Sequence, residues 1–443
     1  MNKEMSRLAA LVCSAAAACI PMCMQAQSQA LRQGLQHLYT TAEAHNASLV
    51  SMQAAVKTAE AGIETARMSK LPDINGQASF SYLGNARLWN RKFGESTSAP
   101  MPHYGNNFLL QAQQIIYGGG AIKSSITLAE QQAQMAHLSV ADEAQNVRFL
   151  LTSLYLQLHA LRNQQTVYAT NRELALKQIE LMKHRREQGV SLQNDITRYE
   201  LQLQQLELGE TTVTDRQSIL LKQLRTALGT DSASISLLSE NDFDASSISC
   251  GTEADWQQKA QQQHASIKKS ALAVDINRTQ ERLARSERLP KVALMAEDHL
   301  DGPITIEVPP IDKNLNYWFV GVGIRYSFSS LYKSKRKIAE AKLQTAQAQT
   351  QTTVARQGIS DAVHAAYVNL GTAQTELATR RKGVQLANEN YDVVSKRYQN
   401  GLALITDMTD AANMKLEAEL SLANAQINLV YCYYQLKYAS QDL

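Results

Sequence analysis

The feature that most constrains this chain is an internal duplication of its 443-residue sequence. Gly189 precedes Asp195 by the same spacing that separates Gly401 from Asp407, and the separation from Gly189 to Gly401 is called the repeat offset below. Upstream, the repeat offset keeps pairing like with like: Tyr155 with Tyr367, Leu158 with Leu370, and Gln132 with Gln344. A constant offset over so long a stretch indicates two copies of one supersecondary unit, so both halves are expected to fold alike.

The duplication divides the chain into four parts. Residues 1–26 predict a secretory signal peptide, with Lys3 and Arg7 before an apolar core and a small residue, Ala26, at the cleavage site. We expect residues 27–228 to form the first repeat, the polar, Ser-rich residues 229–252 to form a linker, and residues 253–443 to form the second repeat. Each repeat is predicted to contain a helix, two strands and a long helical hairpin.

Long helical patterns dominate both repeats. The sequence predicts helices over residues 31–70, 121–187, 195–228, 254–287 and 331–400, and a last helix after Asp407. A spacing of 4, 3, 4, 3 is typical of a coiled-coil seam, and it is found at Val147, Leu151, Leu154, Leu158 and Leu161 and again at Leu416, Leu420, Ala423, Ile427 and Val430. Helices of roughly 70 residues reach on the order of 100 Å. Each hairpin is expected to turn at its glycine, because glycine readily adopts positive φ.

Four segments alternate apolar and polar residues and predict strands: 74–82, 108–117, 292–296 and 318–328. In the last of them Trp318, Val320, Val322, Ile324, Tyr326 and Phe328 share one face, which is long enough to cross a bilayer as a tilted strand. Four strands cannot close a membrane barrel, and sheet edges exposed to lipid would leave backbone groups unsatisfied. Several chains are therefore expected to contribute strands to one barrel.

Composition and motifs argue against other classes of protein. Lys and Arg number 44 against 41 Asp and Glu, without the basic block that nucleic-acid binding needs. The triple glycine at residues 118–120 lacks the Gly-Lys-Ser/Thr of a phosphate loop, and the nine histidines are scattered. No catalytic residue, cofactor or metal is therefore predicted. One dense cluster of possible ligands, residues 297–301, is expected in a loop, as either a solvated surface or a cation site.

Together, the duplication, the Leu71-Pro72 and Leu289-Pro290 starts of the strand regions, the turn at residues 116–120 and the two glycine tips resemble the outer-membrane efflux protein family of TolC-like channel-tunnels. The resemblance implies a mainly α fold with membrane β strands. Duplicated long helical hairpins and four strands per chain would form a homotrimeric twelve-stranded β-barrel, continued by an α-helical tunnel in the periplasm of a Gram-negative bacterium. It also implies passive exit through the outer membrane, in efflux and in type I secretion. A periplasmic adaptor and an inner-membrane transporter would be the partners.

The resemblance also assigns roles to residues at the tips. Gly189, Val190, Gly401 and Leu402 match the adaptor-docking tips, and Asp195, Tyr398, Asp407 and Asp410 match the pore entrance. Two departures put the family's closing links in doubt, since Ala403 replaces an arginine and Arg186 replaces an aromatic residue. Arg198, the offset partner of Asp410, is the candidate replacement. For Asp195 and Asp407, simple capping of a helix start remains an equal interpretation.

Two other classes of function remain as alternatives. A structural coiled-coil protein of the cell envelope would explain the helices, but it has no need for a membrane-length apolar strand face. A general diffusion porin would need many more than four strands.

Overall fold

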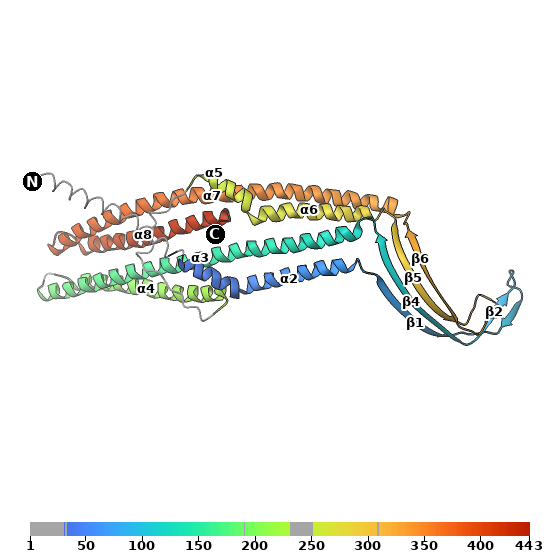
Figure 1. Ribbon diagram of the computed structural model, residues 1–443. Helices are drawn as coiled ribbons and strands as arrows, with labels where there is room; N and C mark the ends of the chain where they lie inside the picture. The colour runs from blue at the N-terminus through green and yellow to red at the C-terminus, as the bar shows by residue number, and fades with distance from the viewer. Residues whose placement is uncertain (1–30, 32, 190, 231–250, 308–309) are drawn as a thin grey trace, which may run out of the picture. The chain divides into compact units, whose positions relative to one another are not determined.

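A computed structural model describes residues 31, 33–189, 191–230, 251–307 and 310–443 (Figure 1). The predicted signal peptide, most of the predicted linker and Val190 lie outside the described residues. The chain forms two compact units, and both halves of the sequence contribute to each. The hairpin unit comprises Met1–Ala54, Leu138–Lys268 and Thr353–Leu443, and the sheet unit comprises Ala55–His137 and Lys269–Thr352.

The sheet unit is built on four antiparallel strands in the order β1-β4-β5-β6. They are β1 (Asp73–Tyr82), β4 (Tyr104–Tyr117), β5 (Lys291–Gly302) and β6 (Leu315–Arg325). β4 and β5, which come from different halves of the chain, pair at the centre and leave β1 and β6 as the edges. Residues opposite one another in a sheet share a face, so Val320 of β6, Ala296 of β5 and Ala112 of β4 lie on the same side.

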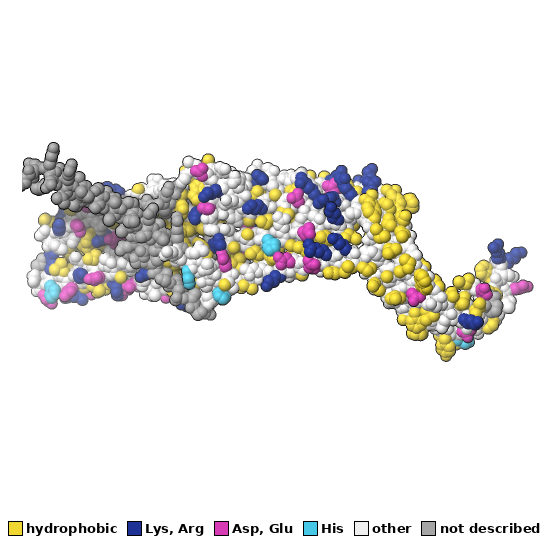
Figure 2. Space-filling view, viewed as in Figure 1, with side chains coloured by type: hydrophobic (Ala, Val, Ile, Leu, Met, Phe, Trp, Pro, Cys, Tyr) yellow, Lys and Arg dark blue, Asp and Glu magenta, His cyan; other side chains and the backbone are white. Residues whose placement is uncertain are grey.

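That face is apolar and exposed. Figure 2 shows hydrophobic side chains gathered over the strands. Exposed members of the face are Ile74, Phe80, Leu110, Leu294, Trp318, Val320, Val322 and Ile324. A monomeric soluble protein rarely leaves so large a contiguous apolar area exposed to water.

Two strand predictions differ from the structure. The fourth strand spans Leu315–Arg325 rather than residues 318–328, so Tyr326 and Phe328 lie beyond its end. The third strand does not stop at Ala296 but continues to Gly302, because β4 is long enough to pair with it as far as Asn106. The cluster at residues 297–301 is therefore part of a strand rather than a loop. The region between the first two predicted strands contains a short hairpin of β2 (Ala86–Trp89) and β3 (Ser96–Ala99), which the sequence patterns did not indicate.

The long helices begin and end close to their predicted bounds. They are α3 (Ala121–Glu187), α4 (Gln193–Leu228), α7 (Ser330–Gln399) and α8 (Ile405–Ala439). The start of α4 is separated from the start of α8 by the repeat offset, and so is the end of α3 from the end of α7. The division of the chain into two repeats at residues 228 and 253 stays a prediction.

The two shorter helical regions are broken, whereas the sequence predicted continuous helices. Residues 33–45 are helical and α2 (Ala47–Met68) starts after Asn46, while α5 (Glu253–Gln263) and α6 (Ala265–Ser286) flank His264. Asn46 Oδ1 accepts a hydrogen bond from the Leu49 amide (3.1 Å), and His264 Nδ1 lies 3.2 Å from the Ser266 amide. Each break is thus satisfied by a side chain that caps the next helix. Both breaks lie at the same distance in sequence before the Leu-Pro pair of their own half.

The core of the hairpin unit joins the two halves. The predicted seam of α3 is buried at all five positions from Val147 to Leu161. Leu151, Leu154 and residues of α8 such as Ile427 and Val430 belong to one hydrophobic cluster. No helix among the described residues is both long and apolar enough to cross a membrane.

Candidate functional site

The two hairpin tips bring most of the predicted site residues into one region of the hairpin unit. Gly189 (φ 77°) turns the chain between α3 and α4, and Gly401 (φ 73°) turns it between α7 and α8. Other residues rarely adopt this left-handed conformation, so glycine allows the tight reversal. Leu402 is exposed at the second tip. Val190 lies outside the described residues.

Asp195 and Asp407 both close the first turn of the helix that follows the tip. An Asp195 carboxylate oxygen accepts a hydrogen bond from the Leu192 amide (3.3 Å), and Asp407 accepts one from the Leu404 amide (3.0 Å). Each carboxylate thus accepts a hydrogen bond from an amide at the start of its helix. Its negative charge also interacts favourably with the positive end of the helix dipole. Capping is therefore part of the role of both residues.

Among the described residues, Asp195 has further partners that Asp407 does not have. The hydroxyl of Ser191 lies 3.3 Å from the Asp195 carboxylate. Tyr398, at the end of α7, hydrogen-bonds through its hydroxyl to both Ser191 and Asp195. Burial raises the pKa of the Tyr398 hydroxyl; the Asp195 charge raises it further, while Ser191 and Arg185 oppose the shift. The structure thus joins two predicted entrance residues, Asp195 and Tyr398, across the two hairpins.

Arg185 strengthens this link and was missed by the sequence reasoning. Its guanidinium lies 5.7 Å from the centre of the Tyr398 ring, and its Nη1 donates a hydrogen bond to the carbonyl of Gln399 (2.9 Å). A cation over an aromatic face contributes about 0.5–1 kcal/mol where it is exposed. No sequence motif marks Arg185, because its partners lie in the other half of the chain.

Arg198 and Asp410 do not meet in this chain. Both side chains are exposed, and neither has a hydrogen bond or ion pair with another described residue. They sit one helical turn beyond the capping carboxylates, on α4 and α8 respectively.

A small hydrophobic cluster supports the tips from behind. Tyr199, Ile196 and Met182 are almost fully buried and pack with Met408 from the other hairpin. Burial raises the pKa of the Tyr199 hydroxyl far above its ordinary value. Further hydrogen bonds join the hairpins along the helices, among them Asn171 Nδ2 to Glu419 (2.7 Å), Gln202 Nε2 to Asn413 (3.3 Å) and Gln164 Nε2 to Asn424 (2.6 Å).

Two exposed leucines also belong to the tips and were not predicted. Leu192 and Leu404 precede α4 and α8, at the position where a polar capping residue is preferred, and about 70% of each is exposed. They are separated by the repeat offset, as the two glycines are. That duplication was the signal that could have identified them.

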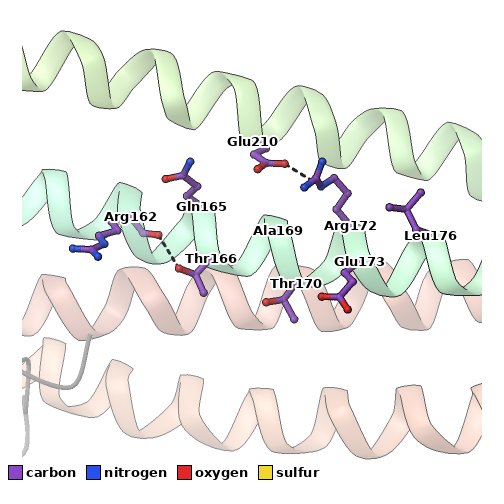
Figure 3. Close-up of a pocket in the computed structure, with 9 residues that line it drawn as sticks. All are labelled: Arg162, Gln165, Thr166, Ala169, Thr170, Arg172, Glu173, Leu176 and Glu210. Carbon is purple, nitrogen blue, oxygen red and sulfur yellow. Dashed lines mark hydrogen bonds and ion pairs between the residues drawn. The ribbon is translucent and has the colours of Figure 1, made fainter. Parts of the chain in front are cut away.

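A separate groove runs along the surface of α3 and α4 (Figure 3). It has a volume of about 540 Å³ and contains an ion pair between Arg172 and Glu210 (Nε–Oε2 3.3 Å). Beside it, Gly209 lets α4 approach α3 closely, since a Cβ there would lie 2.5 Å from the Tyr168 ring. The groove contains none of the predicted site residues.

Comparison with known proteins identifies the family to which this arrangement of strands and hairpins belongs. The model of the outer membrane efflux protein family matches residues 38–230 and 256–440. The chain belongs to this family. The resemblance predicted from the duplication and the tips is thereby confirmed.

Two curated relatives match nearly the whole chain. It is 22% identical to outer membrane protein TolC of Vibrio cholerae serotype O1, over 92% of this chain and 90% of the relative. It is 21% identical to outer membrane efflux protein BepC of Brucella suis biovar 1, over 92% of this chain and 85% of the relative. Among solved structures, CusC has a TM-score of 0.77 at 12% identity, with 92% of each chain covered.

These findings confirm the predicted fold class of long helices with a few strands, and the predicted function and location. The protein is an outer-membrane efflux channel of a Gram-negative bacterium, and its family is one of channels rather than enzymes. The alternative of a structural coiled-coil protein without a pore is not supported.

Proposed function

We propose that three copies of this chain form one continuous duct for substrates delivered by an inner-membrane transporter and a periplasmic adaptor. The observation that carries the proposal is the open four-stranded sheet. β1 and β6 are edges, and most of one face is apolar and exposed. Pairing of β6 in one copy with β1 in the next would satisfy both edges. Three copies give a closed twelve-stranded barrel with the apolar face toward lipid, and the α-helices continue it as a tunnel.

The duct transports without catalysis. Free energy for transport would come from the inner-membrane partner. The cargo would be drugs or other small toxic molecules, metal ions or a secreted polypeptide. The family relationship supports this division of labour, because TolC-like efflux proteins work in tripartite pumps.

The hairpin tips are proposed as the entrance of the duct. The link from Tyr398 to Asp195 would hold the two hairpins of one copy together in the closed state. Asp407, Asp410 and Arg198 would line the entrance, where threefold symmetry brings like carboxylates together. Such rings bind cations, since a cation relieves the repulsion between carboxylates. Added divalent cations should therefore reduce the current through the native channel and leave an Asp407→Ala/Asp410→Ala variant unaffected.

The outer surface of the tips is proposed as the adaptor-docking site. Gly189, Val190, Gly401 and Leu402 were predicted from the resemblance, and the structure adds the exposed Leu192 and Leu404. Exposed leucines on a periplasmic surface favour burial against a protein partner. Leu402→Asp and Leu404→Asp should abolish efflux in cells while leaving conductance in bilayers unchanged. Loss of conductance in the same variants would place these leucines in the channel rather than at a docking surface.

The central test is single-channel recording from purified protein in planar bilayers, combined with its mass in detergent. A trimer that conducts, and whose conductance rises in an Asp195→Ala variant, supports the duct and its entrance. A folded, membrane-extracted monomer without conductance would overturn the proposal.

A further inference from the structure

The second face of the sheet carries a histidine between two carboxylates. Glu297, His299 and Asp301 alternate along β5 and therefore share one face. His299 Nε2 lies 3.0 Å from a Glu297 carboxylate oxygen, and its Nδ1 lies 3.7 Å from one of Asp301. The side chains of His299 and Glu297 are less than one-fifth exposed. Asp298, between them in sequence, lies on the opposite face with Trp318.

Neighbouring strands hold these groups in place. On β4, Gln111 donates a hydrogen bond to Glu297 (2.8 Å) and Asn107 donates one to Asp301 (2.5 Å). On β6, the Tyr317 ring stacks on the imidazole, with centroids 4.6 Å apart and planes within 3°. Each of these three side chains is hydrogen-bonded or stacked, so the positions of the two carboxylates and the imidazole are fixed.

No other ionised group faces His299 from the adjoining strands. Leu109 lies opposite on β4, flanked by Asn107 and Gln111, and the facing residues of β6 are Tyr317 and Phe319. Basic residues on this face, Lys291 and Arg325, stand at the other end of the strands, at the start of β5 and the end of β6. Their separation from His299 is roughly 26 Å at about 3.3 Å per residue, well beyond the screening length of about 8 Å at physiological salt.

We propose that Glu297, His299 and Asp301 form a cation-selecting ring in the channel whose strength is set by the charge of the histidine. The proposal rests on the proposed barrel, in which the face opposite the apolar one lines the lumen. Three copies would place six carboxylates and three imidazoles around the lumen, toward the end of the sheet away from α6. Fixed negative charge in a confined channel concentrates cations and excludes anions.

The ring weakens when the pH falls. Histidine is the side chain whose charge ordinarily changes between pH 5 and 8, and carboxylates ordinarily remain ionised down to about pH 5. Protonation of three imidazoles adds three positive charges to a ring that carries six negative ones. The preference for cations should therefore be strong at pH 8 and fall roughly twofold or more at pH 5.5.

The test is the reversal potential of purified channels under a KCl gradient, recorded at pH 8 and pH 5.5. Native protein should lose cation preference at the lower pH. His299→Asn should keep nearly the same preference at both, since asparagine carries no charge. His103→Asn is the matched control: His103 is exposed in the segment between β3 and β4, and the variant should behave like the native protein.

A second pair of variants tests the carboxylates. Glu297→Gln/Asp301→Asn should lower cation preference at pH 8 to the native value at pH 5.5 or below, whereas Asp298→Asn, on the opposite face, should not. If His299→Asn fails to assemble, this pair still decides the proposal. A native preference that does not change with pH, or one that persists in both variants, would overturn the ring. Absence of any channel in the native protein would instead overturn the proposed duct.

Discussion

The two hairpin tips have the same local structure but different surroundings. Each turns at a glycine with positive φ, continues through an exposed leucine and starts a helix capped by an aspartate. At the first tip, the aspartate also bonds to Ser191 and Tyr398. At the second tip, Asp407 has its capping bond alone among the described residues.

The difference comes from two positions at which the halves have diverged. The repeat offset pairs Ser191 with Ala403, which has no hydroxyl to donate. It pairs Tyr398 with Arg186, whose side chain is exposed and has no bonded partner among the described residues. A duplicated sequence thus repeats the turn and the cap, while the link between hairpins depends on individual side chains.

In the proposed trimer of duplicated chains, hairpins from the first and second halves alternate around the ring. Each contact between the two hairpins of one copy therefore has a counterpart between hairpins of neighbouring copies. Tyr398 reaches Asp195 within the chain, so Arg186 of one copy is expected to reach Asp407 of the next. The ion pair would replace, between copies, the hydroxyl link made within each copy. It would give Arg186 a partner and Asp407 a second one, beyond those that each side chain has among the described residues of one chain.

The largest expected effect is a difference in cross-linking between two cysteine pairs. The two cysteines beyond the predicted signal peptide are first replaced (Cys250→Ser/Cys432→Ser). In that background, Arg186→Cys/Asp407→Cys treated with a short bifunctional thiol-reactive cross-linker should form covalent oligomers. Asp195→Cys/Tyr398→Cys should react within the chain and stay monomeric on denaturing gels. Monomers from the first pair, obtained from protein shown to be trimeric by mass, would rule out the contact between copies.

The next largest effect is expected at the glycine turn that both tips share. Valine at φ near +75° is strained, so Gly189→Val and Gly401→Val should each destabilise their own tip by about 1–2 kcal/mol. Hydrogen exchange of the amides in residues 191–200 and 404–411, measured by mass spectrometry, reports local opening. Unequal effects would show that one turn differs from its counterpart. Gly62→Val, in α2 with open space around it and ordinary helical φ, is the control.

The two capping aspartates should differ in cost. Asp195→Ala loses a cap and the bonds from Ser191 and Tyr398, at about 2 kcal/mol in total, whereas Asp407→Ala loses only the cap, at about 1 kcal/mol. In a single unassembled chain the same exchange measurement should show this order. Equal values there would mean that the Tyr398 link contributes nothing to the stability of the tip.

The link between Tyr398 and Asp195 should appear as an interaction free energy in a double-mutant cycle. Tyr398→Phe should cost about 1 kcal/mol in the native background and almost nothing once Asp195 is alanine. Because the folded-state pKa of Tyr398 is raised, its contribution is present below the ordinary tyrosine pKa of about 10 and is lost as the pH rises through the higher folded value. Exchange at the first tip should therefore accelerate above about pH 10, and less so in Tyr398→Phe.

The smallest effect would come from making the second tip resemble the first. Ala403→Ser restores a hydroxyl near Asp407, at the place where Ser191 stands beside Asp195. It should slow exchange at the second tip by about twofold, which corresponds to roughly 0.4 kcal/mol. Ala411→Ser, at a buried position in the same helix, should not slow it.

The sequence alone determined the four long helices, the presence of the four main strands, the glycine turns and the family. Period and offset are local properties, so the four long helices, the strands and the glycine tips could be located from residue order. The breaks at Asn46 and His264 could not, because neither residue is a strong helix breaker. The side-chain amide of Asn46 donates a hydrogen bond to the carbonyl of Ala227 (2.7 Å), which is far away in the chain. The length of β5 likewise depended on its pairing with β4.

In the candidate site, too, some features followed from the sequence and others only from the tertiary structure. The capping aspartates and tip glycines follow from local chemistry, whereas the bond from Tyr398 to Asp195 and the approach of Arg185 required two hairpins from different halves to be packed together. The residues at positions 297–301 show the same limit, because only strand pairing separated His299 and its carboxylates from Asp298 and placed them on one face. Local sequence fixes backbone conformation over a few residues, but the partners of a side chain are decided by which segments the tertiary fold brings beside it.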